Sequence, residues 1–203
     1  MDPRDEAPDR DRLPTLLGER VALRWLEARD VDGLFTLFGD PKVTEYWSWP
    51  AYTARDQAAR LLESIHAHFR EGSLYQWGVV LRGEDRVIGT CTLASIDRTH
   101  LRAEVGFALA SARWGRGLMG EALAVLIDHA FGPLGLRRLE ADVDPRNHRS
   151  LALLERHGFR REGYLRERWR VGGEVQDSAL LGLLARERPR PSDGRRTTPT
   201  STP

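Results

Sequence analysis

The sequence predicts a mixed α/β domain that combines a mostly antiparallel sheet with one parallel β-α-β crossover. Two observations carry this prediction. Between residues 74 and 109, three strand-like runs follow one another with short connections, which favours antiparallel pairing. Over residues 102–143, a strand-like run, a helical pattern and another strand-like run succeed one another. This order favours a parallel crossover, because parallel strands need a long connection.

One strand and two helices are expected before the three strand-like runs. Residues 20–26 alternate as a strand does, and residues 30–39 carry apolar side chains at helical spacing, with Asp30 as the N-cap. Thr53 is the expected cap of a second helical pattern over residues 54–71, which Gly72 closes.

The later elements complete the order β-α-α-β-β-β-α-β-α-β-β. The three strand-like runs lie at 74–81, 86–95 and 102–109. A helix over 120–131, a strand over 136–143 and a helix over 150–158 follow. Two closing strands, 162–171 and 174–185, surround the turn Gly172-Gly173.

At 203 residues the chain suits one folded domain, which we place at residues 15–188. Residues 1–14 and 189–203 are charged or rich in proline and polar residues, and we expect them to be disordered tails. The 31 basic residues nearly cancel the 30 acidic ones, so no net field attracts polyanions. We therefore expect neither nucleic acid nor a membrane as a partner.

The chain lacks the patterns of export and of metal binding. No apolar run approaches the roughly 20 residues that span a bilayer, and the first residues do not form a signal pattern. Cys91 is the only cysteine, and the histidines show no ligand spacing. We expect a cytoplasmic protein without a metal, in which Cys91 is a buried small hydrophobe.

Residues 115–120 read Gly-Arg-Gly-Leu-Met-Gly, which matches the G-x-G-x-x-G pattern of dinucleotide sites. We reject that interpretation, because a meander precedes the loop where a dinucleotide site needs parallel βα units. The Walker A lysine is also absent. The physical property remains: unpaired N–H groups at a helix start attract an anion, and glycines let a phosphate approach the backbone.

The run "RWGRGLMGEAL" resembles the pyrophosphate loop of the GNAT superfamily of N-acetyltransferases, especially its ribosomal-protein N-terminal acetyltransferase branch. "LRWLEARDVDGLFTLFGDPKVTEYW", "EVGFAL" and "NHRSLALLERHGF" extend the resemblance over about residues 15–188. It implies the GNAT fold, a twisted, mostly antiparallel sheet whose fourth and fifth strands splay apart. Acetyl-CoA would lie in the V between them.

The resemblance also implies which residues bind the cofactor. They are Phe107, Ala108, Leu109, Trp114, Gly115, Arg116, Gly117, Leu118, Met119, Gly120, Asn147 and Ser150. Gly117 matches the family's loop pattern, whereas Trp114 and Met119 depart from it at positions where main-chain N–H groups make the contacts. The tyrosine general acid of the family falls at Leu154, which cannot donate a proton.

Acetyl transfer to an amine needs a group that accepts the amine's proton and a donor that polarises the carbonyl oxygen. The resemblance places a base or water-positioning residue at Glu104; a strand carboxylate without a role is the alternative. His100 is either a proton relay or a surface histidine. Main-chain N–H groups near Phe107–Leu109 are the candidate donors.

Aromatic residues supply the candidates for an acceptor pocket. Tyr46, Trp47 and Trp49 lie in one loop and either wall that pocket or fill the core. Trp169 and Asp177 on the closing hairpin are second-choice pocket residues.

The resemblance thus implies an acetyl-CoA-dependent N-acetyltransferase that acetylates a primary amine by direct attack in a ternary complex. We expect the acceptor to be a protein or peptide N-terminus. Acetylation of a small amine (an amino acid, polyamine or antibiotic) and a catalytically inactive CoA-sensing module stay open as alternatives, and so does a homodimer.

Overall fold

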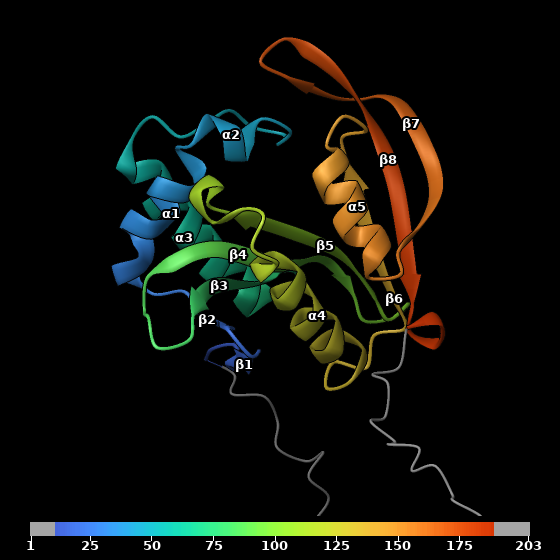
Figure 1. Ribbon diagram of the computed structural model, residues 1–203, viewed down its shortest axis with the longest axis horizontal. Coiled ribbons are helices and arrows are strands. Elements are labelled where there is room, and N and C mark those ends of the chain that lie inside the picture. Colours follow the sequence, from blue (N-terminus) through green and yellow to red (C-terminus); the bar gives the residue numbers. More distant parts are fainter. Residues whose placement is uncertain (1–10, 189–203) are drawn as a thin grey trace, which may run out of the picture.

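The computed structural model describes residues 11–188, which form one eight-stranded sheet in the order β1-β2-β3-β4-β5-β6-β8-β7 (Figure 1). The strands are β1 (Leu16–Leu17), β2 (Val21–Trp25), β3 (Tyr75–Leu81), β4 (Val87–Asp97), β5 (Arg102–Leu109), β6 (Arg138–Val143), β7 (Arg160–Val171) and β8 (Glu174–Leu184). The helices are α1 (Val31–Phe38), α2 (Pro41–Thr44), α3 (Arg55–Glu71), α4 (Leu118–Phe131) and α5 (His148–Arg156). Only β5 and β6 pair in parallel among these strands, which confirms the predicted mixed fold class.

Two short elements were not predicted. The two-residue strand β1 pairs with β2, and the four-residue helix α2 begins after Asp40, whose side chain accepts a hydrogen bond from Lys42 N. Both elements are too short to produce a hydrophobic period. The other helices and strands agree with the expected order, although α4 and α5 each begin two residues earlier than expected.

Two predicted helix caps differ in detail. Asp30 stands at the N-cap position of α1, but its side chain accepts from Glu27 N and pairs with Arg24, so it does not bond to α1 amides. Ala54 takes the cap position of α3 that we assigned to Thr53. The Gln57 side chain accepts from both of these backbone N–H groups, which explains how the helix starts without a side-chain cap.

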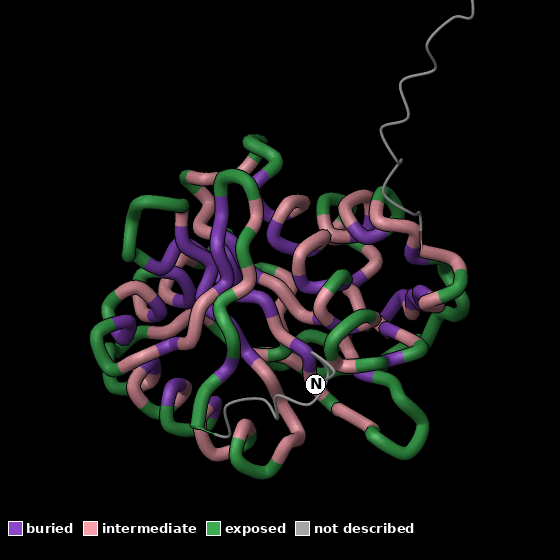
Figure 2. Tube along the Cα trace, turned by 90° about the horizontal axis from the view of Figure 1, so that it is seen from below, coloured by how far each residue is buried: buried purple, intermediate pink, exposed green. Residues whose placement is uncertain are grey.

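The sheet separates two apolar clusters, and Figure 2 shows buried residues concentrated along its strands. α4 packs on one face, where Leu123 and Leu126 are fully buried, and α1 and α3 pack on the other, where Leu34 is fully buried. Cys91 lies in the α4 cluster with no exposed surface, as predicted, and burial raises the pKa of its thiol to about 12.

Two residues of the expected first tail, Leu13 and Pro14, contact the described domain. Leu13 is buried in the α4 cluster, and Pro14 O accepts a hydrogen bond from the Trp77 indole, so these two residues belong to the fold. Residues 1–10 and 189–203 of the expected tails lie outside the described residues. None of the helices within residues 11–188 has the length and apolar composition needed to cross a membrane.

β5 and β6 diverge after a short parallel contact. Arg102, Ala103 and Glu104 pair with Arg138, Leu139 and Glu140, and no pairing between the two strands continues beyond this point. When the unpredicted strand β1 is left out of the count, these are the fourth and fifth strands that the resemblance expected to splay. The divergence leaves the β6-facing edge of residues 105–109 without a neighbouring strand.

Candidate functional site

The loop before α4 presents backbone N–H groups toward an open space. Gly115 and Gly117 adopt left-handed φ angles of 74° and 75°, which glycine tolerates best. The N–H groups of residues 115–120 donate to no other group in the described chain, and no side chain caps α4. Together with the helix dipole, these free donors suit an anion.

Three side chains hold this loop in place. Arg20 Nε donates to Glu121 Oε2 at 2.8 Å, and Arg20 Nη1 donates to Arg116 O at 3.0 Å, which fixes the loop to the start of β2. Trp114 Nε1 donates to Leu109 O at 2.8 Å, which ties the loop to the end of β5. The free N–H groups therefore belong to a braced segment.

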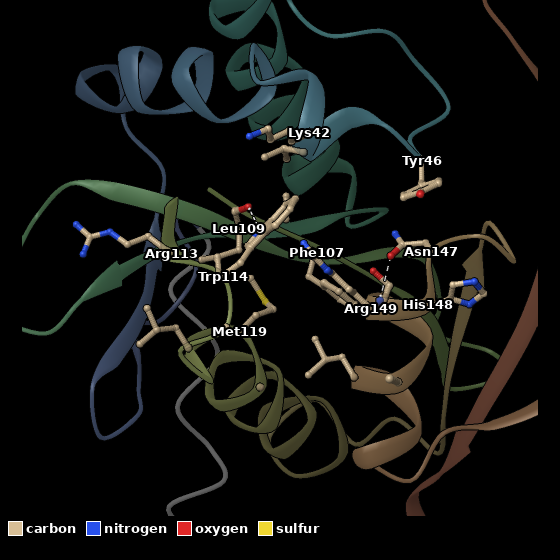
Figure 3. Close-up of a pocket in the computed structure, with 18 of the residues that line it drawn as sticks. Lys42, Tyr46, Phe107, Leu109, Arg113, Trp114, Met119, Asn147, His148 and Arg149 are labelled. Atoms are coloured by element: carbon tan, nitrogen blue, oxygen red, sulfur yellow. Dashed lines mark hydrogen bonds between the residues drawn. The ribbon is translucent and has the colours of Figure 1, made fainter. Parts of the chain in front are cut away.

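A cavity of about 1170 Å³ lies between this loop, the end of β5, α2 and α5 (Figure 3). The residues expected to bind the cofactor all line it: Phe107, Ala108, Leu109, Trp114, Gly115, Arg116, Gly117, Leu118, Met119, Gly120, Asn147 and Ser150. Asn147 Oδ1 accepts from Ser150 N at 3.1 Å and so caps α5. This bond explains why α5 begins at His148.

The first cavity is strongly basic. Its lining includes Lys42, Arg113, Arg116, Arg146, Arg149 and Arg156 and one carboxylate, Glu45. Such an excess of cations suits a ligand that carries several phosphates. Sequence reasoning did not assign Arg149 and Arg156 to the site, although their seven-residue spacing places them on one face of α5.

Arg149 also makes a contact across the cavity. Its guanidinium carbon lies 4.8 Å from the centre of the Trp114 ring, within cation–π range, and in Figure 3 Arg149 extends from α5 while Trp114 comes from the loop before α4. This cation–π contact therefore links α5 to the loop before α4 across the cavity.

A second cavity of about 360 Å³ adjoins the first. The two share the lining residues Tyr46, Trp47, Phe107, Asn147 and Ser150. The second cavity contains the carboxylates of Glu104, Asp142 and Asp144, and no lysine or arginine stands among its described lining residues. A basic chamber and an acidic chamber thus meet beside the open edge of β5.

Glu104 is poised in this acidic chamber. Burial raises the pKa of its carboxyl group, and the nearby carboxylates of Asp142 and Glu140 raise it further. Arg168 opposes this shift, since its Nε lies 3.7 Å from Asp142 Oδ2 and its charge lowers the pKa of Glu104. A carboxylate with a raised pKa in a cavity has the character of a general base.

The aromatic loop serves both of the roles we considered. Trp47 packs edge-on against Phe38 at 5.2 Å and against Trp49 at 4.6 Å, so the rings contribute to packing. Tyr46 and Trp47 also line both cavities, and Trp49 lines the second. The loop connects α2 to α3, and its rings line the acidic chamber.

Three candidates lie outside both cavities. Asp177 accepts from Tyr164 Oη and Glu167 N and so holds a bulge in β7, where the pairing shifts between Leu165 and Trp169. The Trp169 ring is partly exposed under Arg168. His100 turns toward Asp97, 2.8 Å away, and is mostly exposed. The bulge could not be foreseen from an alternating pattern, which implies regular pairing.

Comparison with known proteins finds that the chain is similar to N-acetyltransferases of the GNAT family. A family model for the acetyltransferase (GNAT) domain matches residues 20–160. "Uncharacterized N-acetyltransferase p20" of Bacillus licheniformis is 37% identical, over 86% of this chain and 98% of that protein. The "[Ribosomal protein uS5]-alanine N-acetyltransferase" of Escherichia coli is 29% identical, over 83% of this chain and 89% of that protein.

One relative acts on a different acceptor, and one solved structure holds a CoA compound. The spermidine N(1)-acetyltransferase of Vibrio cholerae is 26% identical, over 83% of this chain and 95% of that protein. The structure of Mycobacterium smegmatis RimJ in complex with CoA-disulfide superimposes with a TM-score of 0.78 at 29% identity. That match covers 87% of this chain and 90% of the RimJ chain.

Proposed function

Because this chain belongs to the acetyltransferase (GNAT) domain family and is an N-acetyltransferase, we propose that it acetylates the N-terminal amine of a protein or peptide, with acetyl-CoA as the donor. The observation that carries the proposal is the junction of two chambers of opposite charge. Phosphates suit the basic chamber, and a protonated amine suits the acidic one.

The residues present fit acetyl-CoA. The free N–H groups of residues 115–120 and the arginines around them suit its pyrophosphate, while Asn147 and Ser150 suit the amide groups of its arm. Acetyl-CoA supplies an acyl carbon that bonds to the amine nitrogen as the carbon–sulfur bond breaks. In the proposed complex, N–H groups on the unpaired edge of β5 polarise the carbonyl oxygen.

Glu104 has the role of the base. It accepts a proton from the acceptor's ammonium group, directly or through a water. Because the pKa of Glu104 is raised, it differs less from the pKa of the acceptor amine, which favours this proton transfer. Leu154 is fully buried and cannot protonate the departing thiolate, so that proton comes from another donor or from water. The transfer is direct and forms no covalent link to the protein.

The test is release of free CoA thiol with a panel of acceptors. Peptides with a free N-terminus, the same peptides with a blocked N-terminus, and polyamines are each offered with acetyl-CoA. The proposal predicts thiol release and a mass gain of one acetyl group for the free peptides only. Binding of acetyl-CoA without turnover of any amine would identify an inactive CoA-binding module, and turnover of polyamines alone would identify a small-amine enzyme.

A further inference from the structure

Gln76 is a buried polar residue that the proposed reaction leaves without a role. It lies on β3 and lines the acidic chamber, and the residue is 7% exposed. Its amide makes no hydrogen bond to any residue between 11 and 188. The amide atoms of Gln76 do not stand among the fully buried unpaired side-chain atoms of residues 11–188, so they remain accessible from the chamber and can pair with a ligand or a bound water.

A row of residues across the sheet leads from Gln76 to Glu104, the proposed base, and no large side chain stands between them. Gln76 pairs with Thr92 on β4, and Thr92 pairs with Gly106 on β5, so the three residues form a row under the chamber. Gly106 has no side chain, and a Cβ placed there would meet only Thr92 Cβ, at 3.6 Å. Glu104 follows two residues away on the same face of β5.

The spacing of the row suits an extended peptide. Gln76 lies two strands from Gly106, or roughly 10 Å, and Glu104 lies roughly 7 Å further along β5. These are backbone separations, and the Gln76 amide and the Glu104 carboxylate lie closer together when their side chains extend toward each other. Because a peptide advances about 3.3–3.6 Å per residue, an amine at Glu104 places the first or second peptide group near Gln76.

We propose that Gln76 hydrogen-bonds a backbone amide of the acceptor and is the residue that selects a peptide over a polyamine. This inference rests on the proposed function. A glutamine amide offers one acceptor and two donors, which complement the N–H and C=O of a peptide group. A fully protonated polyamine carries no acceptor, so it leaves the Gln76 N–H groups unpaired in a buried site, and such sites reject ligands that lack the matching atom.

The test compares Gln76→Met with the wild type on two acceptors, a short peptide with a free N-terminus and spermidine. Gln176→Met is the matched control, because Gln176 is 8% exposed, also has no hydrogen bond from its side chain to the described residues, and lines neither cavity. We expect Gln76→Met to lower kcat/KM for the peptide at least about tenfold and not to lower any rate of thiol release that the wild type shows with spermidine. Its thermal midpoint should stay close to that of the wild type, since the substitution removes no hydrogen bond within the described residues.

An equal loss on both acceptors, or no loss on the peptide, would overturn the role of Gln76. A wild type that releases no thiol with any amine would instead overturn the proposed function. In that case calorimetry of the peptide with the CoA-bound protein decides the inference without turnover. Affinity that falls in Gln76→Met and not in Gln176→Met supports it, and equal affinity in the wild type and both variants contradicts it.

Discussion

The guanidinium carbon of Arg149 lies 4.8 Å from the centre of the Trp114 ring, so α5 and the loop before α4 meet across the basic chamber. A planar cation stacked on an indole contributes more than charge alone. We expect Arg149→Met to raise the Kd for acetyl-CoA by about 2- to 30-fold. Arg149→Lys, which keeps the charge and loses the planar group, should show part of this loss. Calorimetry measures the Kd of both variants. If Arg149→Lys binds acetyl-CoA as tightly as the wild type, Arg149 contributes to binding through its charge alone and the stacking on Trp114 has no effect.

The backbone at Gly115 should be open to the pyrophosphate. Gly115 has a φ of 74° and Gly135 has a φ of 65°, and a Cβ at either position would meet nothing within 4 Å. Gly115→Val and Gly135→Val should therefore each lose at least about 1–2 kcal/mol of stability from the left-handed backbone. Only Gly115→Val should weaken acetyl-CoA binding, by about 10- to 150-fold, because only Gly115 lines the chamber. Equal affinity in the two variants would remove the loop from the binding site.

Leu154 should be structural. It is fully buried in the α4 cluster, so Leu154→Ala should lower the free energy of unfolding by about 2–5 kcal/mol in a denaturant titration. Leu154→Tyr restores the family's general acid at the edge of the acidic chamber, yet it should not raise kcat much, because the rest of the site is arranged without a tyrosine at this position. A large gain in kcat would show that protonation of the thiolate limits the reaction.

Charges beside Glu104 should move the acid limb of the pH–rate profile in opposite directions. Asp142 raises the pKa of Glu104 and Arg168 lowers it. A base must be deprotonated to act, so Asp142→Asn should move the limb to lower pH and Arg168→Gln to higher pH. Profiles of kcat/KM at saturating acetyl-CoA measure both shifts. Movement in the same direction would assign the limb to another group.

Much of the fold and of the basic chamber could be predicted because it follows from local signals. Gly115 and Gly117 mark a loop that needs left-handed backbone, and the order of periodic segments identifies the crossover around it. Asn147 was identified through the resemblance as a residue of the site, whereas its role as the cap of α5 was not foreseen.

The acidic chamber was harder to foresee, because it depends on registers between distant strands. Gln76, Asp142 and Glu104 meet only through the pairing of β3, β4, β5 and β6. Each alone looks like an ordinary polar residue in a strand. The placement of Trp169 and Asp177 depends on a bulge, which sequence alternation does not reveal.

The measurement that tests the central claim most directly is the pH dependence of peptide acetylation by Glu104→Gln. Because the pKa of Glu104 is raised in the fold, its ionised form destabilises the protein above that pKa, so the neutral variant should be at least as stable near neutral pH. At neutral pH we expect kcat to fall by about 10²–10⁴-fold while the Kd for acetyl-CoA stays unchanged. The difference in kcat between the wild type and Glu104→Gln should decrease as pH rises toward the pKa of the acceptor amine, since a free amine needs no base. Wild-type turnover by Glu104→Gln across this pH range would contradict the account.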